Sequence, residues 1–286
     1  MATFYNQATL SYNGNVTNSN ITAGEIIEVL SADKYAVTNT YSADSDIVYI
    51  ISIVNTGSSP VSNITVTDDL GAYSAGKTDV KAVPLTYNEG TVGYYVNGVI
   101  QTAPTVTAVS PLTITGINVP ADGNALIVYS ARTNSFAPLG AGASITNTAS
   151  ISGSGFETIT VSEKITADNA IDLAITKALS PSSVEANGEV TYTFVIQNFG
   201  GNTVTAGDDV IFSDTFTPAL GSLTAEFNGT QWSAGTNYSY SETTGVFSSL
   251  SGQITVPAAQ FIQDAATGEW SVQPGISTLT IRGNIL

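Results

Sequence analysis

The chain contains two copies of one strand pattern, and this duplication constrains its fold more than any other feature. The segment "KYAVTNTYSADSDIVYIISIVNTG", which begins at Lys34, is matched by "KALSPSSVEANGEVTYTFVIQNFG", which begins at Lys177. Further along, "VTDDL" around Asp68 is matched by "FSDTF" around Asp214, at nearly the same interval. A repeat of about 140 residues that occurs twice predicts two similar domains.

Each copy has the pattern of β structure. Short runs such as "DIVYIISIVN" and "EVTYTFVIQN" are separated by turn signals such as "NTGSSP", "PADGN" and "NFGGN". The Asn-Gly pair in "YYVNGVIQ" predicts a tight hairpin with a type I′ turn. Short strands at this spacing predict an all-β chain of two tandem Greek-key sandwiches.

The register of the repeat indicates that it starts inside a domain. Near the N-terminus, "FYNQATLSYNG" resembles "ITNTASISGSG", and the match places Asn6 on Asn147. The first domain therefore has its closing strand around Asn147, whereas the second ends at "TLTIRGNIL", which we match to "ALIVYSART". We expect the second sandwich to lack its closing strand. The predicted division is a donor strand (1–13), a linker (14–25), the first sandwich (26–155), a second linker (156–167) and the second sandwich (168–286).

The strand pattern resembles a known family. "DLAITKALSPSSVEANGEVTYTFVIQNFGGNTV…FSDTF" is similar to the conserved repeat called domain of unknown function 11, and "DIVYIISIVNTGSSPVSNITVTDDL" and "ITNTASISG" carry the same marks. The resemblance implies immunoglobulin-like β-sandwiches in tandem and a role in surface assembly or adhesion. The duplicated chain also resembles the appendage proteins of clostridial spores, which implies an extracellular location on a cell or spore surface.

Charge and composition disfavour several classes of function. With 23 acidic and 7 basic residues the net charge is −16, which repels nucleic acid and anionic lipid. We find no apolar run of about 18 residues and no signal peptide, so we expect neither membrane insertion nor Sec export. Histidine and cysteine are absent, which removes disulfides, thiolate or imidazole metal sites and Ser-His-Asp triads. We expect no cofactor, no metal and no enzyme with turnover.

The inward faces of the predicted strands repeat the same polar residue types among apolar ones. In the first domain these polar residues are Lys34 (after Leu30 and Ala32), Asp68 (among Ile64, Val66 and Leu70) and Asn147 (among Ile145, Ala149 and Ile151). In the second they are Lys177 (after Leu173 and Ile175) and Asp214 (among Val210, Phe212 and Phe216). Each predicted core thus holds one lysine and one aspartate, and the closing strand supplies the asparagine.

These three residue types suggest a self-catalysed cross-link. Burial disfavours an ammonium and so favours the neutral, nucleophilic amine of Lys34. Asp68 is placed to hold the proton and polarise the Asn147 carboxamide, with Asp69 as the alternative acid. Attack on the amide would expel ammonia and leave a Lys-Asn isopeptide bond, chemistry that the family resemblance supports.

A purely structural interpretation stands beside this one. The lysines would reach solvent at strand ends, Asn147 would cap a turn, and Asp68 and Asp214 would bind backbone groups. Recurrence of the same types at equivalent places, in a chain with five lysines, favours the chemical interpretation.

An incomplete second sandwich would expose an unpaired sheet edge. The N-terminal segment offers a strand for it, because it places five residues on one face in the order of types found around Asn147: Phe4, Asn6, Ala8, Leu10 and Tyr12. Folding back within the chain would close a ring, donation to the next subunit would make a head-to-tail homopolymer, and a frayed N-terminus would do neither. We favour the fibre, with Asn6 bonding to Lys177 beside Asp214 of a neighbour.

Two other functions remain open from the sequence. An adhesin or carbohydrate-binding module would use exposed aromatic rings of the second half, namely Trp232, Tyr238, Tyr240 and Trp270. Calcium binding would use the acidic pairs Asp68-Asp69 and Asp208-Asp209, although these lack the spacing of a dedicated calcium loop.

Overall fold

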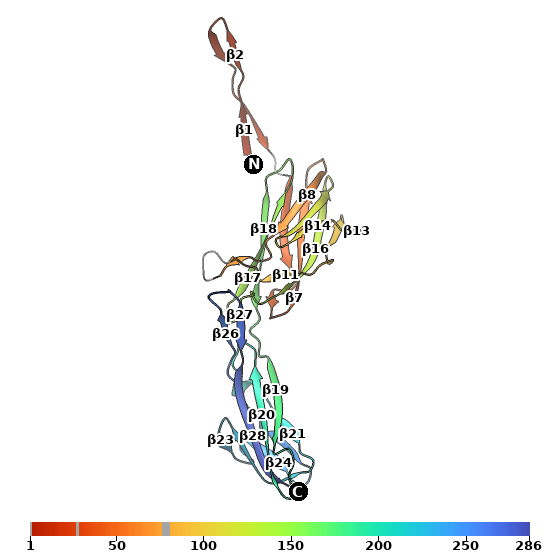
Figure 1. Cartoon of the computed structure of the whole chain (residues 1–286). Helices are drawn as coiled ribbons and strands as arrows, with labels where there is room; N and C mark the ends of the chain where they lie inside the picture. Colours follow the sequence, from red (N-terminus) through yellow and green to blue (C-terminus); the bar gives the residue numbers. More distant parts are fainter. Residues whose placement is uncertain (1, 27–28, 76–80) are drawn as a thin grey trace.

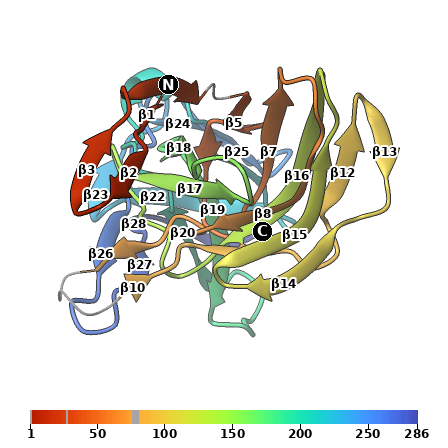
Figure 2. The same ribbon diagram turned by 90° about the horizontal axis from the view of Figure 1, so that it is seen from above.

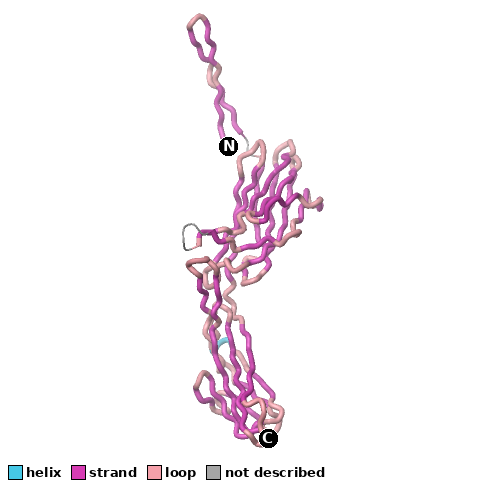
Figure 3. The backbone as a smooth tube through the Cα atoms, viewed as in Figure 1, coloured by secondary structure: helices cyan, strands magenta, loops and turns pink. Residues whose placement is uncertain are grey.

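The protein is built from strands and turns. The computed structural model describes residues 2–26, 29–75 and 81–286, where the one helical element is a short 3-10 turn, η1 (Ala206–Asp208) (Figure 3). No helix in these ranges is long and apolar enough to span a membrane. Figure 1 shows three parts along one axis: an N-terminal hairpin, a first sandwich and a second sandwich. The predicted all-β fold with two sandwiches is confirmed.

The first sandwich packs two sheets face to face. Its strands are β5 (Leu30–Ala36), β6 (Thr40–Tyr41), β7 (Asp46–Asn55), β8 (Val61–Asp68), β11 (Leu85–Tyr87), β12 (Gly93–Val96), β13 (Val99–Gln101), β14 (Thr105–Val109), β15 (Leu112–Val119), β16 (Gly123–Thr133), β17 (Ser144–Ser152) and β18 (Ile159–Ala167). One sheet has the order β13-β12-β16-β7-β5, with β11 also paired to β16, and the other has the order β14-β15-β8-β17-β18-β6. Figure 2 shows this sandwich along the long axis.

The core of the first sandwich follows from strict alternation. β7 turns Ile47, Tyr49, Ile51 and Ile53 inward, and all four are buried. The Asn-Gly turn between β12 and β13 has positive φ at Asn97 (49°) and Gly98 (77°). Both values are those of a type I′ turn, so the predicted hairpin is confirmed.

The second sandwich has fewer strands. They are β19 (Leu173–Ser180), β20 (Glu189–Asn198), β21 (Ser213–Thr215), β22 (Leu220–Phe227), β23 (Thr230–Trp232), β24 (Tyr238–Ser241), β25 (Val246–Ser249) and β28 (Gly275–Ile285). The sheets have the orders β19-β20-β28-β22-β23 and β21-β25-β24. Its core is aromatic, with Phe194, Phe212 and Phe247 packed edge to face.

Among the described residues, the second sandwich has no strand in the place that β17 takes in the first. Its β21 corresponds to β8, which pairs with β15 on one side and with β17 on the other. β21 pairs with β25, and no strand of the described residues occupies its second edge. Every residue of β19, the counterpart of β5, is exposed. In the described chain, no counterpart of the β17-β18 hairpin covers this face.

One predicted alignment was wrong by a residue. In the first sandwich Tyr49 pairs with Tyr129 of β16. The alignment that places Lys177 on Lys34 also places Tyr192 on Tyr49, and in the second sandwich Tyr192 pairs with Ile281. Ile281 therefore occupies the place of Tyr129, whereas the match of "TLTIRGNIL" with "ALIVYSART" put Arg282 there. The slip arose because small or polar residues, Ser277 and Gly283, take inward positions of β28 and weaken its apolar alternation.

The N-terminal part is a two-stranded hairpin that projects from the first sandwich away from the second (Figure 1). Its strands are β1 (Ala2–Asn6), β2 (Thr9–Tyr12), β3 (Asn15–Asn18) and β4 (Thr22–Ile26), with β1 paired to β4 and β2 to β3. The expected linker 14–25 is thus wrong, because β3 and β4 occupy it. The expected linker 156–167 is likewise mostly strand β18. Both were missed because polar residues interrupt their apolar alternation.

A hairpin of the second half connects the two sandwiches. It consists of β26 (Gln260–Gln263) and β27 (Trp270–Gln273), and it contacts the first domain near the short pair β9 (Tyr73–Ser74) and β10 (Lys81–Ala82). The indole N–H of Trp270 donates to the Tyr73 hydroxyl at 3.2 Å, and the Trp270 backbone N–H donates to the carbonyl of Ser135 at 2.7 Å. These contacts brace one sandwich against the other.

Candidate functional site

Lys34, Asp68 and Asn147 lie together in the core of the first sandwich. Lys34 comes from β5, Asp68 from the end of β8, and Asn147 from β17, and all three are buried. Lys34 Nζ donates to Asp68 Oδ2 at 2.6 Å. Neither side chain of this ion pair has any exposed surface. The structure therefore brings the predicted trio into one water-excluded cluster.

Tyr129 connects the acid to the amide, a role that sequence reasoning missed. Its hydroxyl donates to Asp68 Oδ2 at 2.6 Å and accepts from Asn147 Nδ2 at 3.0 Å. Asp68 thus receives hydrogen bonds from both Lys34 and Tyr129. The available signal was the inward position of this tyrosine among the small and aliphatic residues of "ALIVYSA", which indicates a buried hydroxyl in need of a partner.

The carbonyl oxygen of Asn147 is fully buried and makes no hydrogen bond within the described part of the chain. An unpaired buried acceptor costs about 1–3 kcal/mol, so such a group calls for an explanation. The Asn147 amide is thus held through one bond, from its Nδ2 to the Tyr129 hydroxyl, while its oxygen has no partner among the described residues.

Burial and the Asp68 carboxylate act on the pKa of Lys34 in opposite directions. Burial lowers the pKa of Lys34 below its ordinary value, although the Asp68 carboxylate opposes the shift. The ammonium also lies 5.0 Å from the centre of the Tyr49 ring. Because the uncharged amine is the nucleophilic form, the downward direction of this shift is the one that a nucleophilic lysine needs.

The neighbouring acid, Asp69, has a different task. Its Oδ1 accepts the backbone N–H of Thr148 at 2.9 Å and that of Gly71 at 2.8 Å, which ties the end of β8 to β17. Asp68 rather than Asp69 is the carboxylate in contact with Lys34.

The second sandwich repeats the ion pair in an open setting. Lys177 Nζ donates to Asp214 Oδ2 at 2.6 Å, and the ammonium lies 4.8 Å from the centre of the Tyr192 ring, as Lys34 lies over Tyr49. However, the Lys177 side chain is 44% exposed and that of Asp214 is 20% exposed. Ile281 stands where Tyr129 stands in the first domain, so this pair has no bridging hydroxyl.

Asn6 does not reach Lys177 within one chain. It lies in the projecting hairpin beyond the first sandwich, whereas Lys177 lies in the second sandwich (Figure 1). Asn6, Ala8, Leu10 and Tyr12 are all exposed there, with Leu10 at 63%. The side chain of Phe4 lies outside the described part. The predicted donor residues and the open lysine are therefore separate surfaces of one molecule.

The aromatic residues considered for carbohydrate binding do not line a common groove. Trp232 is buried against Phe227, with ring centres 5.2 Å apart, and Tyr238 is buried against Phe247. Tyr240 bonds to the backbone of the second core, and Trp270 belongs to the contact between the sandwiches. These rings stabilise the fold rather than offer a binding face.

The acidic pairs considered for calcium are engaged otherwise. Asp68 and Asp69 make the bonds given above, Asp208 caps η1 through Thr205, and Asp209 bonds to Ser251. Within residues 2–26, 29–75 and 81–286, no group of three or more acidic residues is placed to hold a metal ion.

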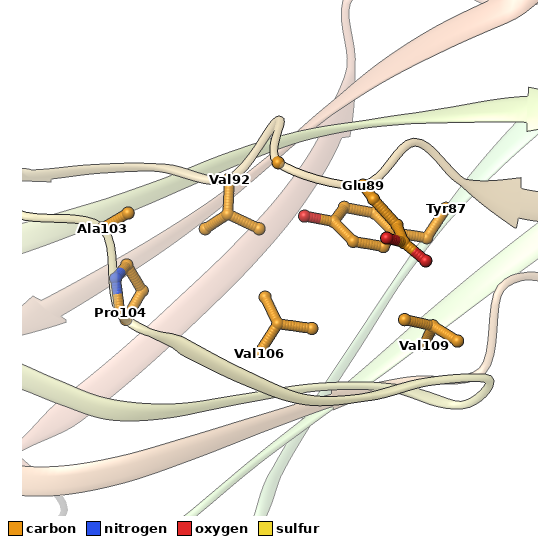
Figure 4. A pocket seen from close by; sticks show the side chains of 8 residues that line it. Tyr87, Glu89, Val92, Ala103, Pro104, Val106 and Val109 are labelled. Carbon is orange, nitrogen blue, oxygen red and sulfur yellow. The ribbon is translucent and has the colours of Figure 1, made fainter.

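A shallow cavity of 340 Å³ opens on the first sandwich beside β14 (Figure 4). Its walls are mainly apolar, with Val92, Val106 and Pro104 facing one another across it and Glu89 at its rim. The lining offers one carboxylate and no arrangement of nucleophile and base, so it suggests no reaction.

We expect the stability of an Asn147→Ala variant, which keeps a free Lys34 amine, to increase with pH. In the folded state the pKa of Lys34 lies below its unfolded value of 10.5. As pH rises towards 10.5, the unfolded state binds more protons than the folded state, so the free energy of unfolding increases. Urea unfolding between about pH 7 and 9.5, below the titration of the tyrosines, measures this. An Asn147→Ala/Lys34→Met variant should show no such rise, and a flat profile in Asn147→Ala would contradict the expectation.

No model of a known protein family matches the chain, and no curated protein is similar to it in sequence. The chain has low-level similarity to several solved structures. They include the RrgB pilus backbone of Streptococcus pneumoniae (11% identity, TM-score 0.34, 86% of this chain and 55% of that one) and BcpA, the major pilin subunit of Bacillus cereus (12%, 0.34, 96% and 73%). A third is the collagen-binding domain of a Staphylococcus aureus adhesin (13%, 0.29, 50% and 98%). The chain thus spans about half the length of the RrgB structure, and such low identities and TM-scores do not establish a shared function.

Proposed function

We propose that the protein is a structural subunit of an extracellular fibre on a cell or spore surface. Subunits join head to tail, and the N-terminal strand of each completes the second sandwich of the next. One comparison carries the proposal: the Lys34-Asp68 pair is closed off by β17, whereas the matching Lys177-Asp214 pair has the same 2.6 Å bond but is open to solvent. The segment that matches β17 projects from the opposite end of the molecule.

The same comparison supports a fibre over a ring. The projecting hairpin and the second sandwich lie at opposite ends of the long axis (Figure 1). The hairpin of one molecule therefore does not reach the open face of its own second sandwich. A contact between two different surfaces repeats without closing and so generates a filament. Strand addition to the free edge of β21 supplies main-chain hydrogen bonds, while alternate side chains enter the open core.

The lysines would then form isopeptide bonds. In the first sandwich a proton passes from Lys34 to Asp68, and the neutral amine attacks the Cγ of Asn147. The new bond joins Lys34 Nζ to Cγ and the bond from Cγ to Nδ2 breaks. The departing NH2 group takes two protons that began on Nζ and leaves as ammonium, so the chain loses the mass of one ammonia. Asp68 carries one of these protons, and Tyr129, bonded to both Asp68 and Nδ2, is placed to pass it on. Asp68 is regenerated, so the step is autocatalytic and has no turnover.

Between subunits, Asn6 takes the place of Asn147. It would meet Lys177 and Asp214 of the neighbour, and donation would bury this pair as the Lys34-Asp68 pair is buried in the first sandwich. Each junction would then be covalent, which prevents unfolding from separating the chains.

Mass spectrometry and a hairpin deletion test the proposal. Purified fibres should dissociate poorly in boiling detergent, and each subunit in them should have lost the mass of two ammonia molecules, one for each lysine. A variant lacking residues 2–26 should remain a monomer that has lost one ammonia, because the first sandwich still contains its own trio. Fibres that form without the hairpin would rule out strand donation, and subunits of unaltered mass would rule out both bonds.

A further inference from the structure

Resting on the proposed function, we infer that the donated element is the whole hairpin β1 to β4 rather than a single strand. β1 and β2 enter beside β21, as β17 lies beside β8, and β4 covers β19 of the next subunit, as β18 covers β5. The partner is a second copy of this chain. The acceptor surface consists of the exposed face of β19 and the segment that follows it up to Val184.

The pairing register of the hairpin carries the inference. In the first sandwich Asn147 of β17 pairs with Glu163 of β18. In the N-terminal hairpin Asn6 of β1 pairs with Thr22 of β4. The interval along the chain from Asn6 to Asn147 equals that from Thr22 to Glu163, so the hairpin reproduces the β17-β18 unit with its cross-strand register at this position. A lone donor strand has no need of a partner strand in that register.

The acceptor surface lacks what β18 provides in the first domain. Two pairs of residues matched by the alignment of Lys34 with Lys177 show this difference. Leu30 of the first domain is 8% exposed, whereas its match Leu173 in the second is 37% exposed. Likewise Tyr41 is 2% exposed, whereas its match Val184 is 41% exposed. Filling the edge of β21 alone would replace β17 but would leave this row without the counterpart of β18.

β18 also makes a defined contact that β4 is able to repeat. Thr166 and Ala167 pair in parallel with Thr40 and Tyr41 of β6, and the Thr166 backbone N–H donates to the carbonyl of Asn39 at 2.9 Å. The counterparts of Thr166 and Thr40 are Glu25 in β4 and Ser183 after β19. We therefore place Glu25 of one subunit opposite Ser183 of the next.

Side-chain bulk is redistributed between the two surfaces in the way that such a contact requires. In the first domain β5 carries small residues, Ala32 and Ala36, while β18 carries Ile165. In the second domain the matched residues of β19 are large, Ile175 and Leu179, and the match of Ile165 in β4 is Gly24. A layer with large residues on β19 and a small residue on β4 keeps a packed interface, since packing tolerates volume-conserving exchange.

Engineered disulfides test the inference cleanly, because the chain has no cysteine of its own. The variant carries Glu25→Cys and Ser183→Cys, with Asn6→Ala to remove the isopeptide link between subunits. Under oxidising conditions its fibres should give a ladder on a denaturing gel that collapses to monomer with reductant. The matched control, Glu25→Cys with Ala178→Cys on the opposite face of β19, should give no ladder.

The outcomes separate the two proposals. Fibres without a disulfide ladder would overturn the hairpin inference and leave strand donation standing, whereas absence of fibres would contradict the proposed function itself. A second pair of variants guards against misfolding caused by cysteine. Gly24→Ile should raise the concentration needed for fibre growth roughly ten-fold through overpacking against β19, and adding Leu179→Ala should restore it. Unchanged growth with Gly24→Ile would also overturn the inference.

Discussion

Replacing Asp68 with alanine is expected to destabilise the first sandwich by about 3–5 kcal/mol, because it leaves the buried Lys34 without its carboxylate. Tyr129 would lose its acceptor at the same time. The comparison belongs in an Asn147→Ala background, where no covalent bond contributes. For a domain of this size the midpoint of thermal unfolding should fall by about 10–20 °C, measured by calorimetry. With Asn147 intact, Asp68→Ala should also abolish the loss of ammonia in the first domain.

A second variant separates the lost charge partner from lost packing. Lys34→Met combined with Asp68→Leu removes both charges and fills the same space, and replacing a buried ion pair in this way is often neutral or stabilising. In the same Asn147→Ala background it should therefore regain most of the lost stability, while remaining unable to form the bond. If Asn147→Ala/Asp68→Ala were as stable as Asn147→Ala alone, Asp68 would not be stabilising a charged Lys34 in the folded state.

The sequence predicts the trio in the first core because alternation fixes which side of a strand each residue faces. Lys34, Asp68 and Asn147 each stand at the inward phase of a clear apolar pattern, so their burial follows from the period of a strand. Which partner each one bonds does not follow, since this depends on how the two sheets align. Tyr129 was missed for that reason: its alternation gave burial, but only the packed sandwich places its hydroxyl between Asp68 and Asn147.

The N-terminal hairpin shows the opposite failure. Residues 14–25 are polar and contain no strong alternation, so they resemble a linker, yet β3 and β4 pair with β2 and β1 through backbone hydrogen bonds. A two-stranded ribbon without a core is at best marginally stable alone. The polar residues of β4 match those of β18, a strand near the edge of its sheet that is only partly buried. A strand in such a place needs few apolar residues.

The two lysines also differ in where their asparagine comes from. Asn147 belongs to the same chain as Lys34, so the proposed bond between them would accompany folding of one domain. Lys177 would receive Asn6 from another chain, so it stays exposed and solvated until assembly. Burial of the Lys177-Asp214 pair by the neighbour's strand would then couple bond formation to docking. The chain would thereby avoid reacting with unspecific amides before a neighbour has docked.

Replacing Asn6 with alanine is expected to convert a fibre that survives boiling in detergent into one that dissociates to monomer. The substitution removes the only amide carbon that the hairpin presents at the position of Asn147, but it leaves the backbone of β1 and the Lys177-Asp214 pair in place. Fibres should therefore still form and be visible by electron microscopy, while the ladder on a boiled denaturing gel disappears. Asn147→Ala is the matched control: it should keep the ladder and lose only the bond within the first sandwich. A ladder that persists in Asn6→Ala would mean that the covalent junction lies elsewhere, and would contradict the proposed bond between Lys177 and the N-terminal hairpin.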